Sequence, residues 1–123
     1  MSTTGPRYLY FNSRDELYRI EMQNIVYIEA DGNYTHLILR SGQRGTVCMS
    51  LMQMHNVLNT KLKEQSAHFA RVGKRYIINL QCVYHINTLK QQLTLSDGAT
   101  FSHDIGISKE ALRQLKELFV KHI

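Results

Sequence analysis

Two carboxylates, Glu29 and Asp31, lie in the stretch YIEADGNYTH between two apolar runs. Side chains two positions apart share one face of an extended strand, so this pair is suited to acid–base chemistry or to holding a cation. Catalysis also needs a histidine, serine or lysine partner, and the sequence indicates none for either carboxylate. Glycine and asparagine tolerate positive φ, so Asp31-Gly32-Asn33 is typical of a hairpin turn. We therefore interpret the carboxylates as part of a turn that projects residues 33–36 at a sheet edge.

The densest group of cations lies in FARVGKRYIIN, residues 69–79, where Arg71, Lys74 and Arg75 fall close together. Arginine can bind guanine with two hydrogen bonds, and lysine can pair with phosphate as a point charge. Gly73 lets the backbone turn or approach a partner closely. The charges are equally consistent with a solvated edge strand that is protected against aggregation by its cations.

Motifs for other chemistry are absent from the sequence. Gly73-Lys74 lacks the preceding glycine and the following hydroxyl residue of a phosphate-binding loop. The six histidines show no metal-ligand spacing, and no serine or cysteine nucleophile motif is present. We expect Cys48 and Cys82 to be reduced core residues. The sequence thus predicts no enzyme, no catalytic residue, no metal site and no cofactor.

The totals favour one soluble domain with an anionic partner. The chain has 123 residues, a formal net charge of +5 and 43% hydrophobic residues, which argues against disorder. No apolar run is long enough to span a bilayer, and the N-terminus has no signal-peptide pattern, so we predict a cytoplasmic protein that does not contact membranes. A pI near 9.4 favours nucleic acid, with acidic proteins as competitors.

The segments that position these residues are mostly short strands. β-branched and aromatic runs separated by turn residues predict strands at residues 7–11, 16–21, 25–30, 34–40, 45–49, 76–79, 83–87, 92–96 and 99–102. Asp97-Gly98 predicts a hairpin between the last two. Helical spacing after Ser50 predicts a helix to about Leu62, and a second helix follows Ser108, with Leu112, Leu115, Leu118 and Phe119 on one face. This pattern indicates a mostly-β domain, a sandwich or a partly open barrel.

The order of these segments resembles the LytTR DNA-binding domain family over roughly residues 7–118. The most specific parts are IEADGNY and the block FARVGKRYIIN, followed by LTLSDG and a late serine-capped helix. The resemblance implies an elongated stack of small antiparallel sheets, with about ten short strands and two short helices. We accordingly expect a disordered leader at residues 1–6 and a single domain at residues 7–123.

The resemblance implies a bacterial transcription regulator that reads successive major grooves of double-stranded DNA with loops. Such domains typically bind direct repeats as two copies, and many follow a receiver domain. Transferred onto this sequence, the first reading loop is Asn33–His36, with Thr35 or His36 contacting a base. The second loop is Gly73-Lys74-Arg75, with Lys74 contacting a base. Two positions compete for a third contact, His103 and Lys109, and the spacing to the last helix favours Lys109.

Two alternatives stay open at this point. Gly73 and Arg75 depart from the residues that are common in relatives, so the operator sequence can differ, or the module can act in protein interaction or ligand sensing without DNA. We expect Arg71, Arg75 and Arg44 to contact phosphates. Arg71 has a competing structural role, since it could instead pair with Glu29 inside the fold.

Overall fold

The computed structural model describes residues 8–61 and 68–121. Within these ranges the chain forms ten strands in three antiparallel sheets and two α-helices, which confirms the predicted mostly-β fold. The expected leader at residues 1–6 lies outside the described residues. The elements are β1 (Tyr8–Asn12), β2 (Leu17–Glu21), the 3-10 turn η1 (Met22–Asn24), β3 (Ile25–Asp31), β4 (Tyr34–Leu39), β5 (Arg44–Val47), α1 (Leu51–Lys61), β6 (Phe69–Val72), β7 (Tyr76–Asn79), the 3-10 turn η3 (Leu80–Cys82), β8 (Val83–Asn87), β9 (Gln92–Ser96), β10 (Ser102–Gly106) and α2 (Lys109–Val120).

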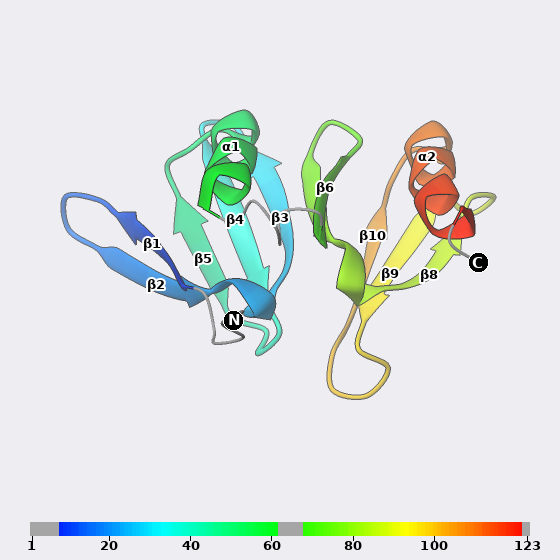
Figure 1. Cartoon of the computed structure of the whole chain (residues 1–123), viewed down its shortest axis with the longest axis horizontal. Helices are drawn as coiled ribbons and strands as arrows, with labels where there is room; N and C mark the ends of the chain where they lie inside the picture. Colours follow the sequence, from blue (N-terminus) through cyan, green and yellow to red (C-terminus); the bar gives the residue numbers. More distant parts are fainter. Residues whose placement is uncertain (1–7, 62–67, 122–123) are drawn as a thin grey trace, which may run out of the picture.

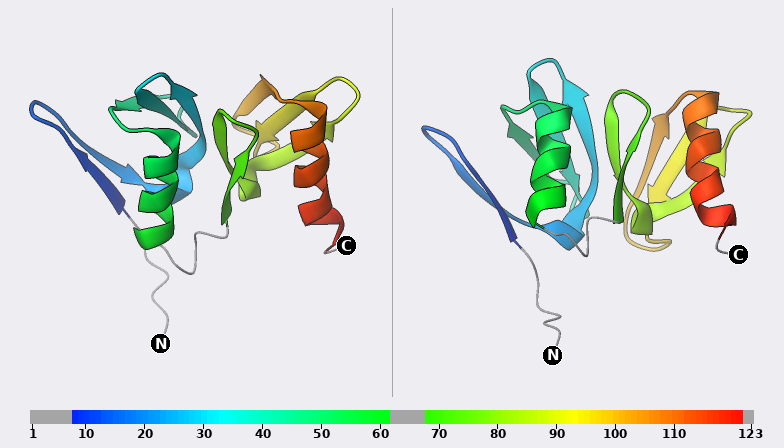
Figure 2. Two further views of the ribbon diagram at one scale, coloured as in Figure 1. Left: turned by 90° about the horizontal axis from the view of Figure 1, so that it is seen from above. Right: turned by 45° about the horizontal axis from the view of Figure 1, so that its top comes forward.

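The three sheets follow one another along the long axis of the molecule (Figure 1). The central sheet has the strand order β5-β4-β3-β7-β6, the β1-β2 hairpin lies at one end, and the sheet β10-β9-β8 lies at the other. Helix α1 lies against the central sheet, and α2 lies beside the β10-β9-β8 sheet (Figures 1 and 2). This arrangement is the elongated stack that the resemblance implied, and not a sandwich or a barrel.

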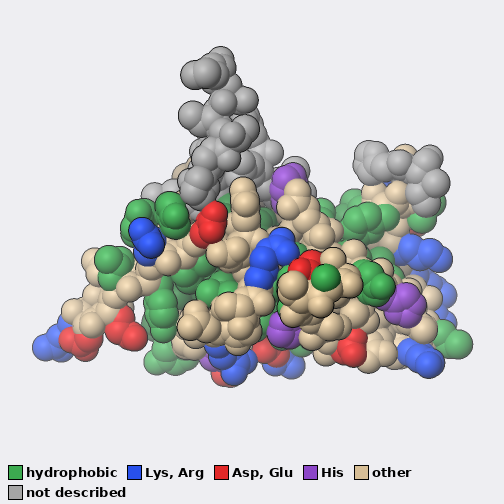
Figure 3. All heavy atoms as spheres, turned by 90° about the horizontal axis from the view of Figure 1, so that it is seen from below, with side chains coloured by type: hydrophobic (Ala, Val, Ile, Leu, Met, Phe, Trp, Pro, Cys, Tyr) green, Lys and Arg blue, Asp and Glu red, His purple; other side chains and the backbone are tan. Residues whose placement is uncertain are grey.

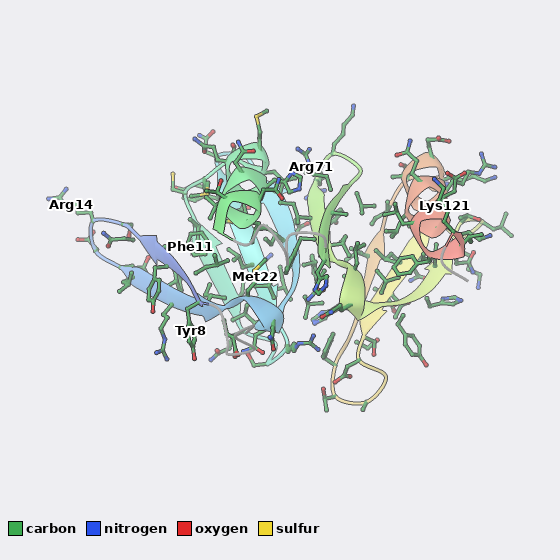
Figure 4. The ribbon with its side chains drawn as sticks, viewed as in Figure 1. Tyr8, Phe11, Arg14, Met22, Arg71 and Lys121 are labelled. Atoms are coloured by element: carbon green, nitrogen blue, oxygen red, sulfur yellow. The ribbon has the colours of Figure 1, made fainter. Side chains whose placement is uncertain are left out.

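Two hydrophobic cores hold the stack together, and the central sheet contributes to both. Ile28 and Ile77 belong to the core beneath α1, which the hairpin closes with Leu9 and Phe11. Ile78, the next residue of β7, belongs to the core beneath α2. Successive strand residues point to opposite faces, so alternation along β7 divides its side chains between the two cores. In Figure 4, Phe11 and Met22 lie inside the first core, whereas Arg14 lies at the far tip of the hairpin.

Both helices begin at the predicted serines. The Ser50 hydroxyl accepts a hydrogen bond from the backbone N–H of Gln53 at 3.1 Å. The side-chain oxygen of Gln53 in turn accepts one from the backbone N–H of Ser50 at 2.9 Å. This reciprocal pair is a capping box. Ser108 caps α2 by accepting from the Ala111 N–H at 3.3 Å. The apolar face of α2 is shorter than predicted, since Leu118 and Phe119 are 45% and 37% exposed.

Two other details differ from the sequence predictions. β10 begins at Ser102 and not at residue 99, so Asp97-Gly98 opens a loop of five residues between β9 and β10 rather than a tight hairpin. The Asp97 carboxylate organises this loop by accepting from the Ala99 and Thr100 N–H groups, at 2.9 and 2.7 Å, and from the Thr100 hydroxyl. Cys82 is buried as expected, but Cys48 is exposed.

The Asp97 loop should show in the acid stability of the protein. Its hydrogen bonds, first from the Thr100 hydroxyl and then from the backbone, hold the Asp97 pKa well below the usual range. Because ionised Asp97 makes these bonds, its stabilising effect is complete above the unfolded pKa of about 4 and is lost as the pH falls through the folded pKa. We expect Asp97→Ala to lower the thermal melting temperature at pH 7, with the difference from wild type shrinking in acid.

The matched control is Asp97→Asn, which keeps an oxygen acceptor but cannot ionise. Melting curves of the three proteins between about pH 2 and pH 7 give the comparison. A gap between wild type and Asp97→Ala that stays constant down to the lowest pH would contradict this role of the ionised carboxylate.

Candidate nucleic-acid interface

The two turns that carry the predicted reading residues lie at the same edge of the central sheet. Asp31 is opposite Tyr34 across the β3–β4 pair, and Glu29 is opposite Tyr76 across the β3–β7 pair. Both pairs are antiparallel, so the β3–β4 and β6–β7 turns follow the same end of β3. A hydrogen bond of 2.8 Å from the Ala30 N–H, near the end of β3, to the Arg75 carbonyl ties the β6–β7 turn to β3. Both turns are at the top of Figure 1 and come forward together in the right panel of Figure 2.

Glycine makes both turns possible. Gly32 has a φ of +61° and Gly73 a φ of +68°, and other residues rarely adopt these values. Asn33 does not adopt positive φ, so Gly32 alone supplies the unusual conformation of the first turn. The glycine at position 73 thus has a conformational reason.

The start of α2 completes this edge. A Cβ placed on Gly73 would lie 3.8 Å from the Ala111 Cβ, which puts the first turn of α2 directly beside the β6–β7 turn. Lys109 is the exposed first residue of that helix. The β8–β9 turn lies next to it, because the Ile107 N–H donates to the Gln91 carbonyl at 3.1 Å. We call the surface formed by the β3–β4 turn, the β6–β7 turn and the start of α2 the tip edge.

Histidine 103, the competing candidate for the third contact, has a different place. It is half-buried in the middle of the stack, where its ring packs edge-on against Tyr27, with 5.8 Å between ring centroids. A second ring, that of Phe101, lies 6.0 Å away. His103 therefore fills space between the central sheet and the β10-β9-β8 sheet, and Lys109 is the candidate that lies at the tip edge.

The first turn holds its histidine rigidly. The His36 Nε2 lies 2.8 Å from a carboxylate oxygen of Asp31, and the Nδ1 lies 2.9 Å from the Thr46 hydroxyl. These contacts give Asp31 a histidine partner, so the prediction that it has none is wrong. The hydrogen bond from His36, and then its charge, lower the Asp31 pKa. Asn33 and Tyr34 at the turn are exposed, whereas Thr35 is completely buried on the other face of β4. A base contact by Thr35 does not fit this structure.

The second turn presents a free lysine. Lys74 is exposed and makes no ion pair among the residues that the structure describes. The Arg71 guanidinium reaches back to the Lys74 carbonyl at 3.5 Å, a long hydrogen bond across the turn. The Arg71 side chain extends from β6 toward α1 (Figure 4). The partial burial of His55 on α1, and then the charge of Arg71, lower the pKa of His55. Arg71 does not pair with Glu29, so that alternative is wrong.

Glu29 instead binds two other arginines. Its Oε2 lies 3.0 Å from the Arg75 Nη2, and its Oε1 lies 3.6 Å from the Arg44 Nη2. The Tyr76 hydroxyl also donates to Oε2 at 3.4 Å. Burial, followed by the Glu29 charge, raises the pKa of Tyr76 and keeps that hydroxyl protonated. The carboxylate is only 21% exposed, whereas Arg44 and Arg75 are 55% and 63% exposed.

The face opposite the tip edge looks different. Figure 3 views this face from below, and the basic, acidic and histidine side chains of the described residues are interspersed on it without forming a continuous cationic surface. The described residues contain no group of three or more side chains that could hold a metal ion. Across the same ranges, neither helix combines the length and apolar character that a membrane span requires.

The mostly-β stack thus presents two glycine-dependent turns and the start of α2 along one edge, with Lys74 and Lys109 exposed there. The profile of the LytTr DNA-binding domain family matches residues 15–120. The chain therefore belongs to the LytTR family, and this membership supports DNA binding by a bacterial transcription regulator.

A solved structure gives the same fold. The LytTr DNA-binding domain of a protein from Bacillus cereus, assigned as a methyl-accepting/DNA response regulator, superposes with a TM-score of 0.66. The match covers 94% of this chain and 98% of the other, at 17% sequence identity. A comparison with curated proteins gave no match.

Proposed function

We propose that this domain reads a specific sequence of double-stranded DNA by inserting the turns of the tip edge into successive major grooves. The observation that carries the proposal is the meeting of the β3–β4 turn, the β6–β7 turn and the start of α2 at one edge. Turns on a rigid scaffold can contact bases and phosphates together, and phosphate contacts fix the register in which bases are read.

The side chains at the tip edge divide into two roles in this proposal. Lys74, Lys109 and Asn33 are exposed at the turns and contact base edges. Arg71, Arg75 and Arg44 lie further back and contact phosphates. His36 is only 14% exposed, and both of its ring nitrogens have partners, so it orients the first turn rather than reading a base. His103 and Thr35 have no part in the contact.

The wider assembly is also part of the proposal. Two copies of the domain, residues 7–123 each, would bind a pair of direct repeats in the cytoplasm, and a receiver domain or sensor would control them. The description of the Bacillus cereus relative as a response regulator supports the receiver domain in this proposal.

Lys74→Ala tests the proposed base contact. Loss of a lysine that contacts a base should weaken binding to the preferred duplex by about 1–3 kcal/mol, or roughly five- to 150-fold, and random duplex much less. The preferred duplex comes from selection out of a random pool, and fluorescence anisotropy gives both affinities. Lys116→Ala is the matched control, because Lys116 is exposed in the second half of α2. Equal losses on both duplexes would make Lys74 a phosphate contact only.

A second candidate function has one observation in its favour. A cavity of about 510 Å³ lies between the β1-β2 hairpin, β5 and α1, and its walls include Phe11, Tyr18, Tyr34 and Val57. This volume is within the range of small-molecule sites. A ligand-sensing module without DNA binding would bind neither selected nor random duplex measurably, which separates it from the proposed function.

A further inference from the structure

Glu29 is in an unusual place for an acidic residue, because the surface around it is proposed to bind DNA. It is an acidic residue next to the reading turns, and DNA phosphates repel carboxylates. The two arginines that it contacts lie on different strands, Arg44 on β5 and Arg75 directly before β7. Together the three side chains carry a net charge of +1 where the arginines alone would carry +2.

The geometry of these contacts leaves the arginines able to reach a phosphate. Each guanidinium touches Glu29 through a single nitrogen, Nη2, and both side chains remain more than half exposed. Their other N–H groups are therefore available to an incoming oxygen. Non-specific affinity depends on the charge that a protein brings to the DNA backbone and on the counterions released, so the carboxylate cancels one unit of it.

We propose that Glu29 is a specificity-determining residue that restrains Arg44 and Arg75 and so suppresses binding to non-operator DNA. Random binding depends on backbone charge alone. In the operator complex, base contacts by Lys74 and Lys109 fix a register in which the free N–H groups of both arginines meet phosphates, so the carboxylate lowers random binding more than it lowers operator binding. The two guanidiniums and the Tyr76 hydroxyl hold the partly buried Glu29 side chain in place. This inference rests on the proposed function.

Glu29→Gln keeps the size and an oxygen acceptor but removes the charge. We expect its affinity for random duplex at about 0.15 M salt to rise about fivefold, with a salt slope steeper by about one unit, because one more counterion is released. The affinity for the selected duplex should rise less, so the ratio of specific to random affinity falls. Glu117→Gln is the matched control, since Glu117 is exposed on α2 and makes no ion pair among the described residues.

The double variant Glu29→Gln/Arg75→Gln tests whether Arg75 causes the rise in random-duplex affinity. It should return the random-duplex affinity close to that of wild type. Equal random-duplex affinities for Glu29→Gln, Glu117→Gln and wild type would overturn the inference, and so would an equal rise on both duplexes. A wild-type protein that binds no duplex would instead overturn the proposed function.

A melting curve shows whether Glu29→Gln remains folded. If it does not, Glu29→Met, an uncharged side chain of similar size, is measured on the same two duplexes. The same rise on random duplex is expected, and an affinity equal to that of wild type would overturn the inference.

Discussion

Raising the salt concentration from about 50 to 200 mM should weaken duplex binding by one copy of the domain about 100- to 500-fold. The tip edge offers Arg71, Lys74 and Lys109, with a further net charge of +1 from Arg44, Arg75 and Glu29. These four charges predict a slope of log affinity against log salt of about −3.6. Anisotropy titrations on a random duplex at several salt concentrations measure it.

Two comparisons make the salt prediction specific to this surface. Arg71→Gln, which removes a proposed phosphate contact, should reduce the slope by about one unit, whereas Lys116→Gln on α2 should leave it nearly unchanged. A wild-type slope shallower than about −2 would mean that few phosphates are contacted. That result would favour the protein-interaction or ligand-sensing alternative over DNA binding.

Leu112→Ala should destabilise the domain by about 2–5 kcal/mol, because truncation leaves a cavity in a close-packed core. Leu112 is fully buried in the core beneath α2, together with Leu93, Leu95 and Val72. Typical domains are stable by only about 5–15 kcal/mol, so the loss is a large share of the total. Because α2 also supports the β6–β7 turn through Ala111, the variant should lose sequence-specific binding before it unfolds.

Leu118→Ala is the control for that measurement. It makes the same change on the same helix, at a side chain that is 45% exposed, and should cost about 0.5 kcal/mol or less. Urea unfolding monitored by circular dichroism gives both free energies of unfolding. Similar costs for the two variants would mean that α2 is not packed on the sheet as the structure describes.

The local features of this fold were readable from the sequence. Ser50 and Ser108 cap the two helices, and the residues around Gly32 form a hairpin turn. These features could be predicted because each one depends on interactions between residues that are close in sequence. The family resemblance then supplied the arrangement of the sheets, which periodicity alone left open between a sandwich and a barrel. The length of the Asp97 loop was missed because hydrogen bonds to the Asp97 side chain, in addition to the positive φ of Gly98, determine its shape.

The contacts at the site depended on strand pairing that the sequence does not show. Arg71 was a reasonable partner for Glu29 by charge, but the β3–β7 register places Tyr76 opposite Glu29 and brings Arg75 to the carboxylate. This pairing spans more than forty residues. In contrast, the Asp31–His36 pair was within reach, because the two-residue turn makes these side chains diagonal neighbours on adjacent strands. The burial of Thr35 follows from the same alternation.

The division of Ile77 and Ile78 between two cores has a mechanical consequence. Neighbouring residues of one short strand anchor both halves of the molecule, so neither half can loosen or rotate without disturbing the other. The distance between the β3–β4 turn and the start of α2 is therefore fixed by the fold. In the proposed complex with DNA, only bases at a matching separation along the duplex meet both elements, so inserting one base pair between them should weaken binding.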